Sequence, residues 1–290
     1  MFEPLRDLEH AIAQATGQPF HARQQRSVGG GCINDAFVLG DGSRRFFVKT
    51  NRARLHAMFV AEAEGLRALA AGMRVPEVIA EGVSGDTAWL VLEWLEMRGS
   101  PEPAAMGAAL AAVHRITARQ FGWHIDNTIG STPQSNRQHT DWIAFWREER
   151  LMPQFALARR NGVRFGEQEA RLLDALPAFF SGYTPQPSLL HGDLWGGNAA
   201  GLADGTPVVF DPACYFGDRE CDLAMTELFG GFGGRFLAAY DAAWGIDSGY
   251  KVRRSLYNLY HILNHCNLFG GAYESQARQM ISQLLAELRG

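Results

Sequence analysis

Apolar and polar positions in the first part of the chain, up to residue 95, follow the period of strands with one helix among them. Four short runs rich in apolar and β-branched residues predict strands, over residues 33–39, 45–49, 75–80 and 88–94. The first two runs flank Gly40-Asp41-Gly42, a sequence typical of a hairpin turn. Between the second and third runs, apolar residues from Met58 to Leu69 recur at helical spacing, which predicts a helix.

The pattern changes beyond residue 103, where the spacing of apolar residues predicts a mostly helical region. Amphipathic helices are expected over residues 104–117, 141–160, 166–180, 218–229, 236–243, 250–269 and 275–288. Residues 188–212 have irregular β character, and residues 95–103, with glycine and two prolines, form the predicted linker. We therefore expect an α+β fold of two lobes, residues 1–95 and 96–290, of the kind that closes over a ligand.

Composition and charge narrow the classes of function. The chain has 290 residues, 47% of them hydrophobic and 20% charged, so it is long enough for two packed lobes. Its net charge is −4, whereas nucleic-acid-binding proteins typically carry an excess of basic residues. No window reaches the roughly 18 apolar residues of a membrane span, and the N-terminal residues have helical spacing without a signal peptide's apolar core. We expect a cytoplasmic protein that acts on neither nucleic acid nor membranes.

The four cysteines and nine histidines do not have the spacing of a structural zinc site. His261 and His265 are four residues apart on a predicted helix and Cys266 follows directly, but no carboxylate lies close to them and the spacing is not that of a zinc motif. We therefore expect these two histidines to pack or to form hydrogen bonds rather than to bind a metal.

The segment HGDLWGGN, residues 191–198, places a carboxylate five residues before a carboxamide where glycine is too frequent for a helix. Phosphoryl transfer uses such a pair, with Asp193 accepting the proton of the attacking hydroxyl and Asn198 helping to hold a metal ion. Asp211 follows the apolar strand 207–210, so its carboxylate is placed to bridge Mg²⁺ to the phosphates of ATP. Taken singly, each aspartate is equally typical of a surface turn or a strand end.

Three further features lie upstream in the order that a nucleotide site requires. Gly29, Gly30 and Gly31 precede the first predicted strand, Lys49 ends the second, and Glu62 lies on the following helix. N–H groups of a glycine-rich turn can approach phosphates closely, and a strand lysine fixed by a helix glutamate can reach the same phosphates. The order of loop, lysine, glutamate, HxD, asparagine and aspartate is that of the protein-kinase-like fold.

In that arrangement the adenine of ATP lies beside residues 92–95, where backbone groups of Glu93 and Leu95 serve as its hydrogen-bond partners. Cys32 lies over the phosphates, in electropositive surroundings that favour oxidation of a thiol. We hypothesise that its oxidation, for example to a disulfide with another chain, switches activity off. The alternative is a small residue buried beneath the loop.

Six segments carry a resemblance to a known family. They are GGGCI at 29–33, MF at 58–59 with Glu62 and Leu66, FGWH at 121–124, PQSN at 133–136, HGDLWGGN at 191–198 and FDPA at 210–213. Together they resemble the fructosamine kinase (ketosamine 3-kinase) family over nearly the whole chain. The tryptophan and two glycines of HGDLWGGN separate this family from the aminoglycoside and choline phosphotransferases that share its fold.

This resemblance implies transfer of a phosphoryl group from ATP, with Mg²⁺, to the 3-hydroxyl of a sugar attached to an amine. It implies that Asp193 is the base and that Asn198 and Asp211 hold Mg²⁺. Lys49 and Glu62 form the implied ion pair on the phosphate side. A small ketosamine of the ribulosamine or fructosamine type is the expected acceptor, and deglycation is the expected role, because phosphate beside the 2-carbonyl is readily eliminated.

Several other residues near the predicted site have expected roles, some with two interpretations. Trp195 either stacks on the sugar or packs beneath its loop. His191 is expected to anchor the loop, and Asp218 and Asp222 to cap a helix or to tie down the loop after Asp211. Residues 121–136 are too long for a bare connection and are expected to line the acceptor side.

Two alternative functions stay open at this point. One is a phosphotransferase of the same fold that acts on another hydroxylated amine, of the aminoglycoside or choline type. The other is a non-catalytic nucleotide-binding module, which the presence of every predicted catalytic and metal-binding residue disfavours. A protein kinase is disfavoured because no Asp-Phe-Gly or Ala-Pro-Glu sequence follows the catalytic segment. Both a monomer and a homodimer are compatible with the sequence.

Overall fold

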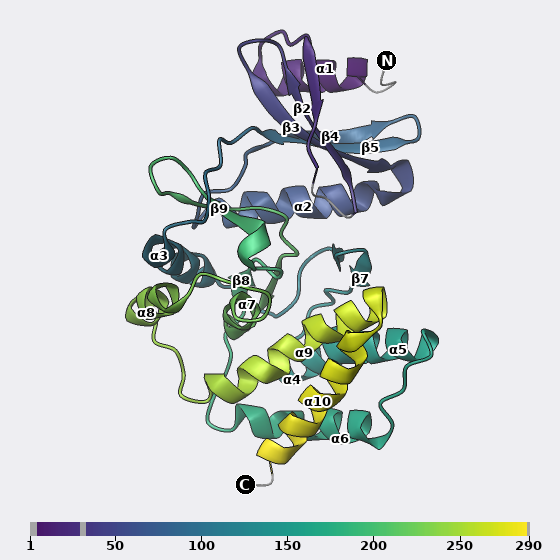
Figure 1. The fold of residues 1–290 in the computed structure, drawn as a ribbon, viewed down its shortest axis with the longest axis vertical. Helices are drawn as coiled ribbons and strands as arrows, with labels where there is room; N and C mark the ends of the chain where they lie inside the picture. Colours follow the sequence, from purple (N-terminus) through teal and green to yellow (C-terminus); the bar gives the residue numbers. More distant parts are fainter. Residues whose placement is uncertain (1–4, 30–32, 289–290) are drawn as a thin grey trace.

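A five-stranded antiparallel sheet forms the N-terminal part of the protein in the computed structural model, which describes residues 5–29 and 33–288. The strand order is β1-β2-β3-β5-β4, with β1 at Gln24–Ser27, β2 at Asp35–Gly40, β3 at Arg45–Arg52, β4 at Val78–Ser84 and β5 at Thr87–Glu93. Helices α1 (Leu5–Thr16) and α2 (His56–Leu69) lie with the sheet in the upper part of Figure 1.

Side chains of the central strands alternate between two hydrophobic clusters. In β5, Trp89 and Val91 pack in the cluster that contains residues of α1, whereas Leu90 and Leu92 pack in the cluster that contains residues of α2. Successive side chains of a strand point to opposite faces of a sheet, so each face receives its own helix. The same alternation in β3 buries Val48 on the α1 side and leaves Lys49 on the side of α2.

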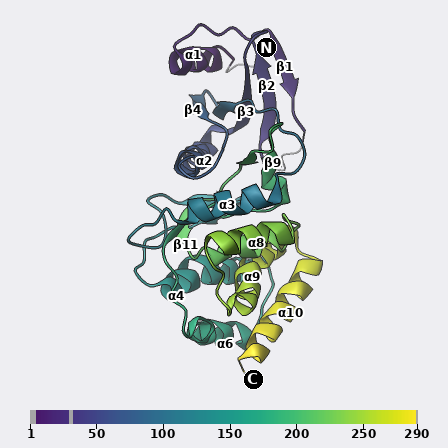
Figure 2. The same ribbon diagram turned by 90° about the vertical axis from the view of Figure 1, so that its left-hand side faces the viewer.

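The remainder of the chain is mainly helical (Figure 2). Its helices are α3 (Pro103–His114), α4 (Trp142–Phe145), α5 (Met152–Arg160), α6 (Glu167–Ala175), α7 (Glu220–Thr226), α8 (Gly234–Ala243), α9 (Tyr250–Phe269) and α10 (Ala272–Glu287). Three short antiparallel pairs join β6 (Asn127–Ile129) to β7 (Thr132–Gln134), β8 (Ser188–Leu190) to β11 (Tyr215–Gly217), and β9 (Ala199–Gly201) to β10 (Pro207–Val209). The expected α+β architecture is confirmed.

Some boundaries differ from those that the sequence predicts. Strand β1 was not predicted, because its sequence QQRS is exposed throughout and has no apolar alternation. The predicted strand at 75–80 begins later, at Val78, since Pro76 lacks the N–H that a sheet ladder needs. The α-helix predicted over 166–180 ends at Ala175 and continues as a 3₁₀ turn that contains Pro177.

One hydrophobic cluster joins the two parts of the molecule. It contains Leu66 and Leu69 of α2, Leu110 of α3, and Val209 and Leu223 from further along the chain, all of them completely buried. The expected boundary at residue 95 falls in the extended chain between β5 and α3, so this shared cluster spans it. Among the residues that the structure describes, no helix combines the length and the apolar character needed to cross a bilayer.

Candidate active site

A cleft of about 670 Å³ brings the predicted site residues of the described chain together, a size typical of small-molecule sites. Its lining includes Gly29, Lys49, Glu62, Glu93, Leu95, Asp193, Trp195, Asn198 and Asp211. These residues come from both sides of the linker, so folding assembles the site across the whole chain. The predicted loop residues Gly30 and Gly31, with Cys32, lie outside the described residues.

Lys49 lies between two carboxylates. Its Nζ donates to Glu62 Oε1 at 2.6 Å and also contacts Asp211 Oδ1. The Lys49 and Glu62 side chains are almost fully buried, whereas Asp211 is about half exposed. Burial opposes the charge of Lys49, but the two carboxylates outweigh that penalty and raise the pKa of the ammonium group. Lys49 is therefore charged, oriented and directed into the cleft.

Asp193 and Asn198 contact one another inside the glycine-rich loop. The Asn198 Nδ2 group donates to the Asp193 backbone carbonyl at 2.9 Å and to Asp193 Oδ2 at 3.1 Å. Burial removes water from the carboxylate, which disfavours its charge and raises the pKa of Asp193 to about 7. The hydrogen bond from Asn198 acts in the opposite direction but is the smaller effect. A carboxyl group with a pKa near neutrality is well suited to exchange a proton with an attacking hydroxyl.

Asp211 has an unusual backbone conformation, because its φ of 55° is the only positive value of a non-glycine residue in the described chain. Such a conformation costs energy and persists where the surrounding structure imposes it, often at functional sites. Here the Phe210 N–H donates to the Asn198 carbonyl at 3.1 Å, and the Ala213 N–H donates to the His191 carbonyl at 2.8 Å. These bonds on either side tie the Asp211 segment to the loop that carries Asp193.

Gly192 permits this close approach between the two segments. Its φ is 81°, and a β-carbon at this position would lie 2.1 Å from the Ala213 carbonyl oxygen. The glycine in the HGD sequence is therefore required by backbone packing as well as by its dihedral angle.

His191 and Asp222 hold the loop that carries Asp193 in place. The buried His191 ring contacts the Phe210 carbonyl through Nε2 at 3.0 Å and accepts the Asp193 N–H through Nδ1 at 3.3 Å. Burial lowers the pKa of His191, so the ring is neutral and both of its nitrogens are occupied. This geometry agrees with an anchoring role.

The Asp222 carboxylate accepts hydrogen bonds from the backbone N–H groups of His191 at 2.7 Å and Gly192 at 2.9 Å. It also contacts His114 Nε2 at 3.2 Å. Although burial opposes its charge, these hydrogen bonds lower the pKa of Asp222. Asp222 was expected to cap a helix or to tie down the loop after Asp211, but its carboxylate binds the loop that carries Asp193. Asp218 instead accepts from the Glu220 N–H at the start of α7 and from two tyrosines.

Residues 92–95, where the adenine is predicted to lie, are only partly available for new hydrogen bonds. The Glu93 carboxylate is engaged by Arg74 at 2.5 and 2.6 Å, and the Glu93 N–H donates to the Glu77 carbonyl at 2.8 Å. Leu95 accepts from the Met97 N–H, while its own N–H has no hydrogen-bond partner within residues 5–29 and 33–288. Of the two residues, Leu95 therefore offers the free backbone donor.

Trp195 lies over the loop and not beneath it. Its side chain is exposed and lines the cleft. A β-carbon at Gly197 would lie 2.3 Å from the indole ring, so the indole rests directly on this glycine. Trp195 and Gly197 thus form one packing unit, which sets the position of the ring at the cleft wall.

The segment predicted to line the acceptor side forms the β6–β7 hairpin, whose residues Asn127, Thr128 and Gly130 line the cleft. The Asn127 side chain donates to the Cys214 carbonyl at 2.8 Å, and Gln134 Nε2 donates to the Asn127 side chain at 2.8 Å. The hairpin is thereby fastened to the chain just after Asp211.

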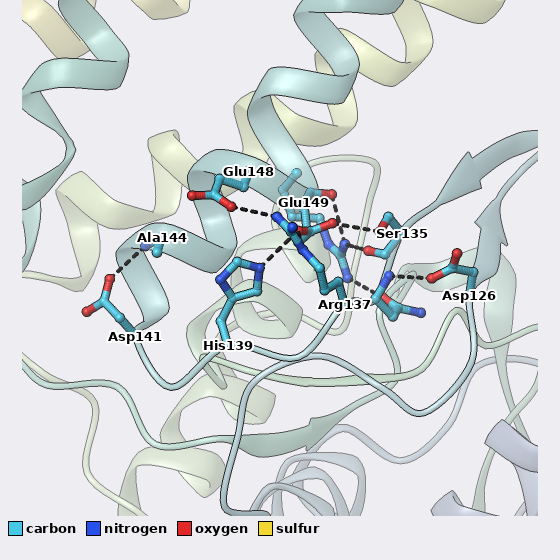
Figure 3. Close-up of polar contacts among 10 residues, drawn as sticks. Asp126, Ser135, Arg137, His139, Asp141, Ala144, Glu148 and Glu149 are labelled. Carbon is cyan, nitrogen blue, oxygen red and sulfur yellow. Dashed lines mark hydrogen bonds and ion pairs between the residues drawn. The ribbon is translucent and has the colours of Figure 1, made fainter.

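A polar network centred on Glu149 holds the far end of this segment (Figure 3). Glu149 accepts from Ser135 Oγ at 2.6 Å, Arg137 Nε at 2.8 Å and His139 Nε2 at 2.9 Å. These bonds outweigh the effect of burial and lower the pKa of Glu149. The buried Arg150 beside it donates to the Ser135 carbonyl at 2.6 Å. Both residues belong to a π-helical turn, Trp146–Leu151, between α4 and α5.

This network also contains the only group of three or more His, Cys, Asp or Glu side chains in the described part of the chain whose ligand atoms lie close together, namely His139, Glu148 and Glu149. Arg137 forms ion pairs with both glutamates, at 2.6 Å and 2.8 Å, so one of their two negative charges is already compensated. The cluster acts as an anchor for residues 135–139. His261 and His265 do not belong to it, and His265 Nδ1 contacts the His261 carbonyl at 2.8 Å.

Sequence reasoning did not identify the contributions of His114, Asn127, Glu149 and Arg150. Each acts on a partner more than ten residues away in sequence, through a contact that only the folded chain creates. The property that distinguishes Glu149 and Arg150 is their burial, which is unusual for charged residues. Burial is a property of the folded chain and cannot be read from a single sequence.

The donor set of the cleft fits a nucleotide with Mg²⁺. Asn198 uses its Nδ2 group toward Asp193, which leaves its side-chain oxygen available, and Asp211 presents a half-exposed carboxylate. Carboxylate and amide oxygens are the ligands that Mg²⁺ prefers. The charged Lys49 can pair with the phosphates, and the free Leu95 N–H can donate a hydrogen bond to the adenine.

Comparison with solved structures defines the class of fold. A crystal structure of a thermostable mutant of the aminoglycoside phosphotransferase APH(4)-Ia aligns with a TM-score of 0.61 at 17% identity, over 97% of this chain and 99% of that one. A structure of a "Putative fructosamine-3-kinase" from Haemophilus somnus aligns with a TM-score of 0.89 at 29% identity, over 98% and 99%. The fold is that of the protein-kinase-like phosphotransferases.

Sequence comparison then identifies the family. The family model described as fructosamine kinase matches residues 4–287. The "Probable ketoamine kinase" of Synechocystis is 49% identical over 287 residues, which cover 97% of each chain. A chloroplastic protein-ribulosamine 3-kinase of Arabidopsis thaliana is 41% identical over 91% of this chain and 83% of the relative. The chain belongs to the fructosamine kinase family.

Proposed function

We propose that the protein is an ATP-dependent kinase that phosphorylates the 3-hydroxyl of a small ketosamine. The observation that carries this proposal is the convergence of Lys49, Asp193, Asn198 and Asp211 on one cleft in a chain of the fructosamine kinase family. The relatives named ketoamine kinase and protein-ribulosamine 3-kinase support a ketosamine as the acceptor. The region up to residue 95 and the region from residue 96 are proposed to act as the two lobes that enclose the nucleotide.

In this mechanism Asp193 accepts the proton of the sugar hydroxyl as that oxygen attacks the γ-phosphate. Its pKa of about 7 allows it to be unprotonated before the reaction and to hold the proton afterwards. Asn198 orients the Asp193 carboxylate through its Nδ2 group. His191 and Asp222 keep the loop in place, so that the base does not need to reorganise during the reaction.

Asn198 and Asp211 are the proposed Mg²⁺ ligands, and Gly29 to Gly31 with Lys49 are the proposed contacts of the phosphates. A Mg²⁺ ion held by Asn198 and Asp211 would supply positive charge to offset the charge of the phosphates. Glu62 keeps Lys49 extended toward them. The free Leu95 N–H is the proposed hydrogen-bond donor to the adenine.

We propose a deglycation role in the cytoplasm, on the chemistry of the proposed product. Phosphate at the 3-position is a far better leaving group than hydroxide, and its elimination beside the 2-carbonyl breaks down the conjugate and frees the amine. The ribulosamine type is the proposed acceptor, because the named relatives include protein-ribulosamine 3-kinases.

The experiment that tests the proposal measures ATP consumption with Mg²⁺ across ribulosamines, fructosamines, erythrulosamines, choline and aminoglycosides. We expect turnover with at least one ketosamine and none with choline or aminoglycosides. Turnover with an aminoglycoside or choline alone overturns the proposed acceptor and leaves the phosphotransferase assignment in place. Absence of turnover with every hydroxylated amine, in protein that binds Mg²⁺-ATP, favours a non-catalytic nucleotide-binding module.

Trp195 is proposed to confine the sugar, since its exposed indole lines the cleft two residues from Asp193. We expect Trp195→Ala to raise the KM for the ketosamine or to lower kcat, with the KM for ATP nearly unchanged. Steady-state kinetics with each substrate varied separately measure this. Equal effects on both KM values would show that Trp195 supports the whole cleft instead of the sugar.

The Glu149 network provides a second test of the acceptor side. Glu149→Gln places an amide among three donors, so we expect a loss of about 1–3 kcal/mol in the free energy of unfolding and a severalfold rise in the ketosamine KM. The matched control is Glu148→Gln, because Glu148 is exposed and, among the described residues, has Arg137 as its only ion-pair partner. Denaturant unfolding and kinetics compare the two variants, and identical behaviour would contradict anchoring of the segment by Glu149.

A further inference from the structure

An aromatic cluster of three half-buried rings and one exposed ring lies at the C-terminal end of α9. We use the name aromatic cluster for Phe229, His265, Phe269 and Tyr273. The His265 ring lies 4.4 Å from that of Phe229, 5.5 Å from that of Phe269 and 5.1 Å from that of Tyr273, measured between ring centroids. Phe269 is 65% exposed, the highest value among the large hydrophobic residues of the described chain. Phe229 and Tyr273 pack against the hydrophobic core on their inner side, and none of the four side chains lines the cleft.

Two contacts place the aromatic cluster just outside the mouth of the cleft. On one side, the Gly196 N–H donates to the Gly230 carbonyl at 3.0 Å, which joins the Trp195 loop to the residue after Phe229. On the other side, a methyl group at Gly130 would lie 3.5 Å from Leu268 Cδ1 and 3.9 Å from Ile33 Cδ1. Figure 1 shows the end of α9 beside β7. The cluster therefore continues the cleft walls that Trp195 and Gly130 form.

The surface of the aromatic cluster is uncharged. His265 Nδ1 contacts the His261 carbonyl at 2.8 Å, and burial lowers the pKa of the His265 ring, which keeps it neutral. The nearest acidic residue on α10, Glu274, is paired with Arg278 at 2.7 Å. Aromatic rings without charge favour apolar groups and offer no ionic partner to a carboxylate. An exposed patch of this kind beside a cleft is typical of a ligand surface.

We infer that the aromatic cluster binds the substituent on the amine nitrogen of the ketosamine, and that this substituent is an aliphatic or aromatic group. The inference rests on the proposed function. The acceptor hydroxyl must reach Asp193, and Trp195 covers the sugar, so the amine and its substituent extend toward the mouth of the cleft. There the aromatic cluster offers an apolar surface beside Trp195 and Gly130.

The test compares two substrates with the same sugar, N-benzyl ribulosamine and N-(2-hydroxyethyl) ribulosamine. The wild-type enzyme is expected to favour the benzyl compound in kcat/KM by a factor on the order of tenfold, mainly through KM, because an apolar group leaves water. In Phe269→Ala this ratio is expected to fall toward one. The matched control is Met152→Ala, since Met152 is another exposed apolar side chain but lies on α5 and does not line the cleft.

A binding measurement separates failure of this inference from failure of the proposed function. The 3-deoxy analogues of both compounds lack the acceptor hydroxyl, so calorimetric titration reports their affinity without turnover. Equal affinities for the two analogues, or a preference that Phe269→Ala leaves intact, would overturn the role of the aromatic cluster while turnover of ribulosamines still supports the kinase. Absence of turnover with a benzyl preference that depends on Phe269 would overturn the kinase and retain the apolar subsite.

Discussion

Replacing Asp193 with asparagine is expected to lower kcat by a factor on the order of 10² or more while Mg²⁺-ATP still binds. Asparagine keeps the size of the side chain and can still accept the hydrogen bond from Asn198, but it cannot take up the proton of the attacking hydroxyl. Turnover is measured with a ribulosamine, and nucleotide binding by the thermal shift that Mg²⁺-ATP produces. Comparable turnover of the wild type and Asp193→Asn would remove the assignment of the base.

The pH dependence gives the same assignment an independent test. A general base must be unprotonated, and the pKa of Asp193 is raised to about 7, so kcat/KM of the wild type is expected to fall as the pH drops below about 7. An aspartate with an ordinary pKa would keep its activity down to about pH 4. A flat profile between pH 5 and 8 would contradict a desolvated carboxyl group as the base.

The same variant is expected to gain stability at high pH. In the folded state Asp193 has a pKa above its unfolded value of 3.8, so the charged carboxylate destabilises the fold progressively from about pH 4 to pH 7 and fully above pH 7. Asp193→Asn lacks this penalty, and its free energy of unfolding should exceed that of the wild type at pH 8 but not at pH 3. Denaturant unfolding at the two pH values measures the difference. Activity at this site thus requires a group that costs stability.

Asp211→Asn is expected to weaken the binding of Mg²⁺-ATP roughly 10–100-fold, by analogy with the loss of a residue that supports a metal site. Turnover is expected to fall as well. Asparagine is the informative substitution because it tolerates the positive φ of 55° at this position, whereas alanine would add backbone strain. Lys49 retains its partner Glu62 in this variant, so the fold should survive. Calorimetric titration with Mg²⁺-ATP gives the affinity.

The matched control for Asp211→Asn is Asp204→Asn. Asp204 lies in the exposed turn between β9 and β10, where it accepts the Thr206 N–H, and it does not line the cleft. The same charge is removed from the protein in both variants, so a difference between them reports the local position of the carboxylate and not the net charge. Equal affinity for Mg²⁺-ATP in Asp211→Asn and the wild type would exclude Asp211 as a metal ligand.

Local patterns in the sequence predicted most of the fold. Helix α9 begins and ends at the predicted residues 250 and 269, and the hairpin of β2 and β3 forms around the predicted glycine turn. These features depend on side-chain periodicity and on turn residues, which act between near neighbours. Strand β1 was not predicted because its exposed residues carry no such pattern. Its place at the sheet edge depends on pairing with β2.

The chemistry of the site was also largely present in the sequence. Asp193 and Asn198 are close in the chain, so their contact follows from the geometry of one short loop. The order of Lys49, Glu62 and Asp211 identified the fold family, and residue identity alone determines that a carboxylate, an amide and an ammonium group are available. For these residues, the sequence by itself determined which groups could take part in phosphoryl transfer.

Only the tertiary structure decided how these groups are held and tuned. Lys49 and Asp211 are 162 positions apart, and their contact exists because the sheet packs against the helical part through one shared cluster. The pKa of Asp193 rises only because folding removes water from around its carboxyl group. Trp195 faces the cleft because Gly197 lies beneath its ring, and Asp222 binds the catalytic loop from another helix. Burial, desolvation and long-range contacts depend on the whole packed chain, whereas periodicity and motif spacing depend only on neighbouring residues.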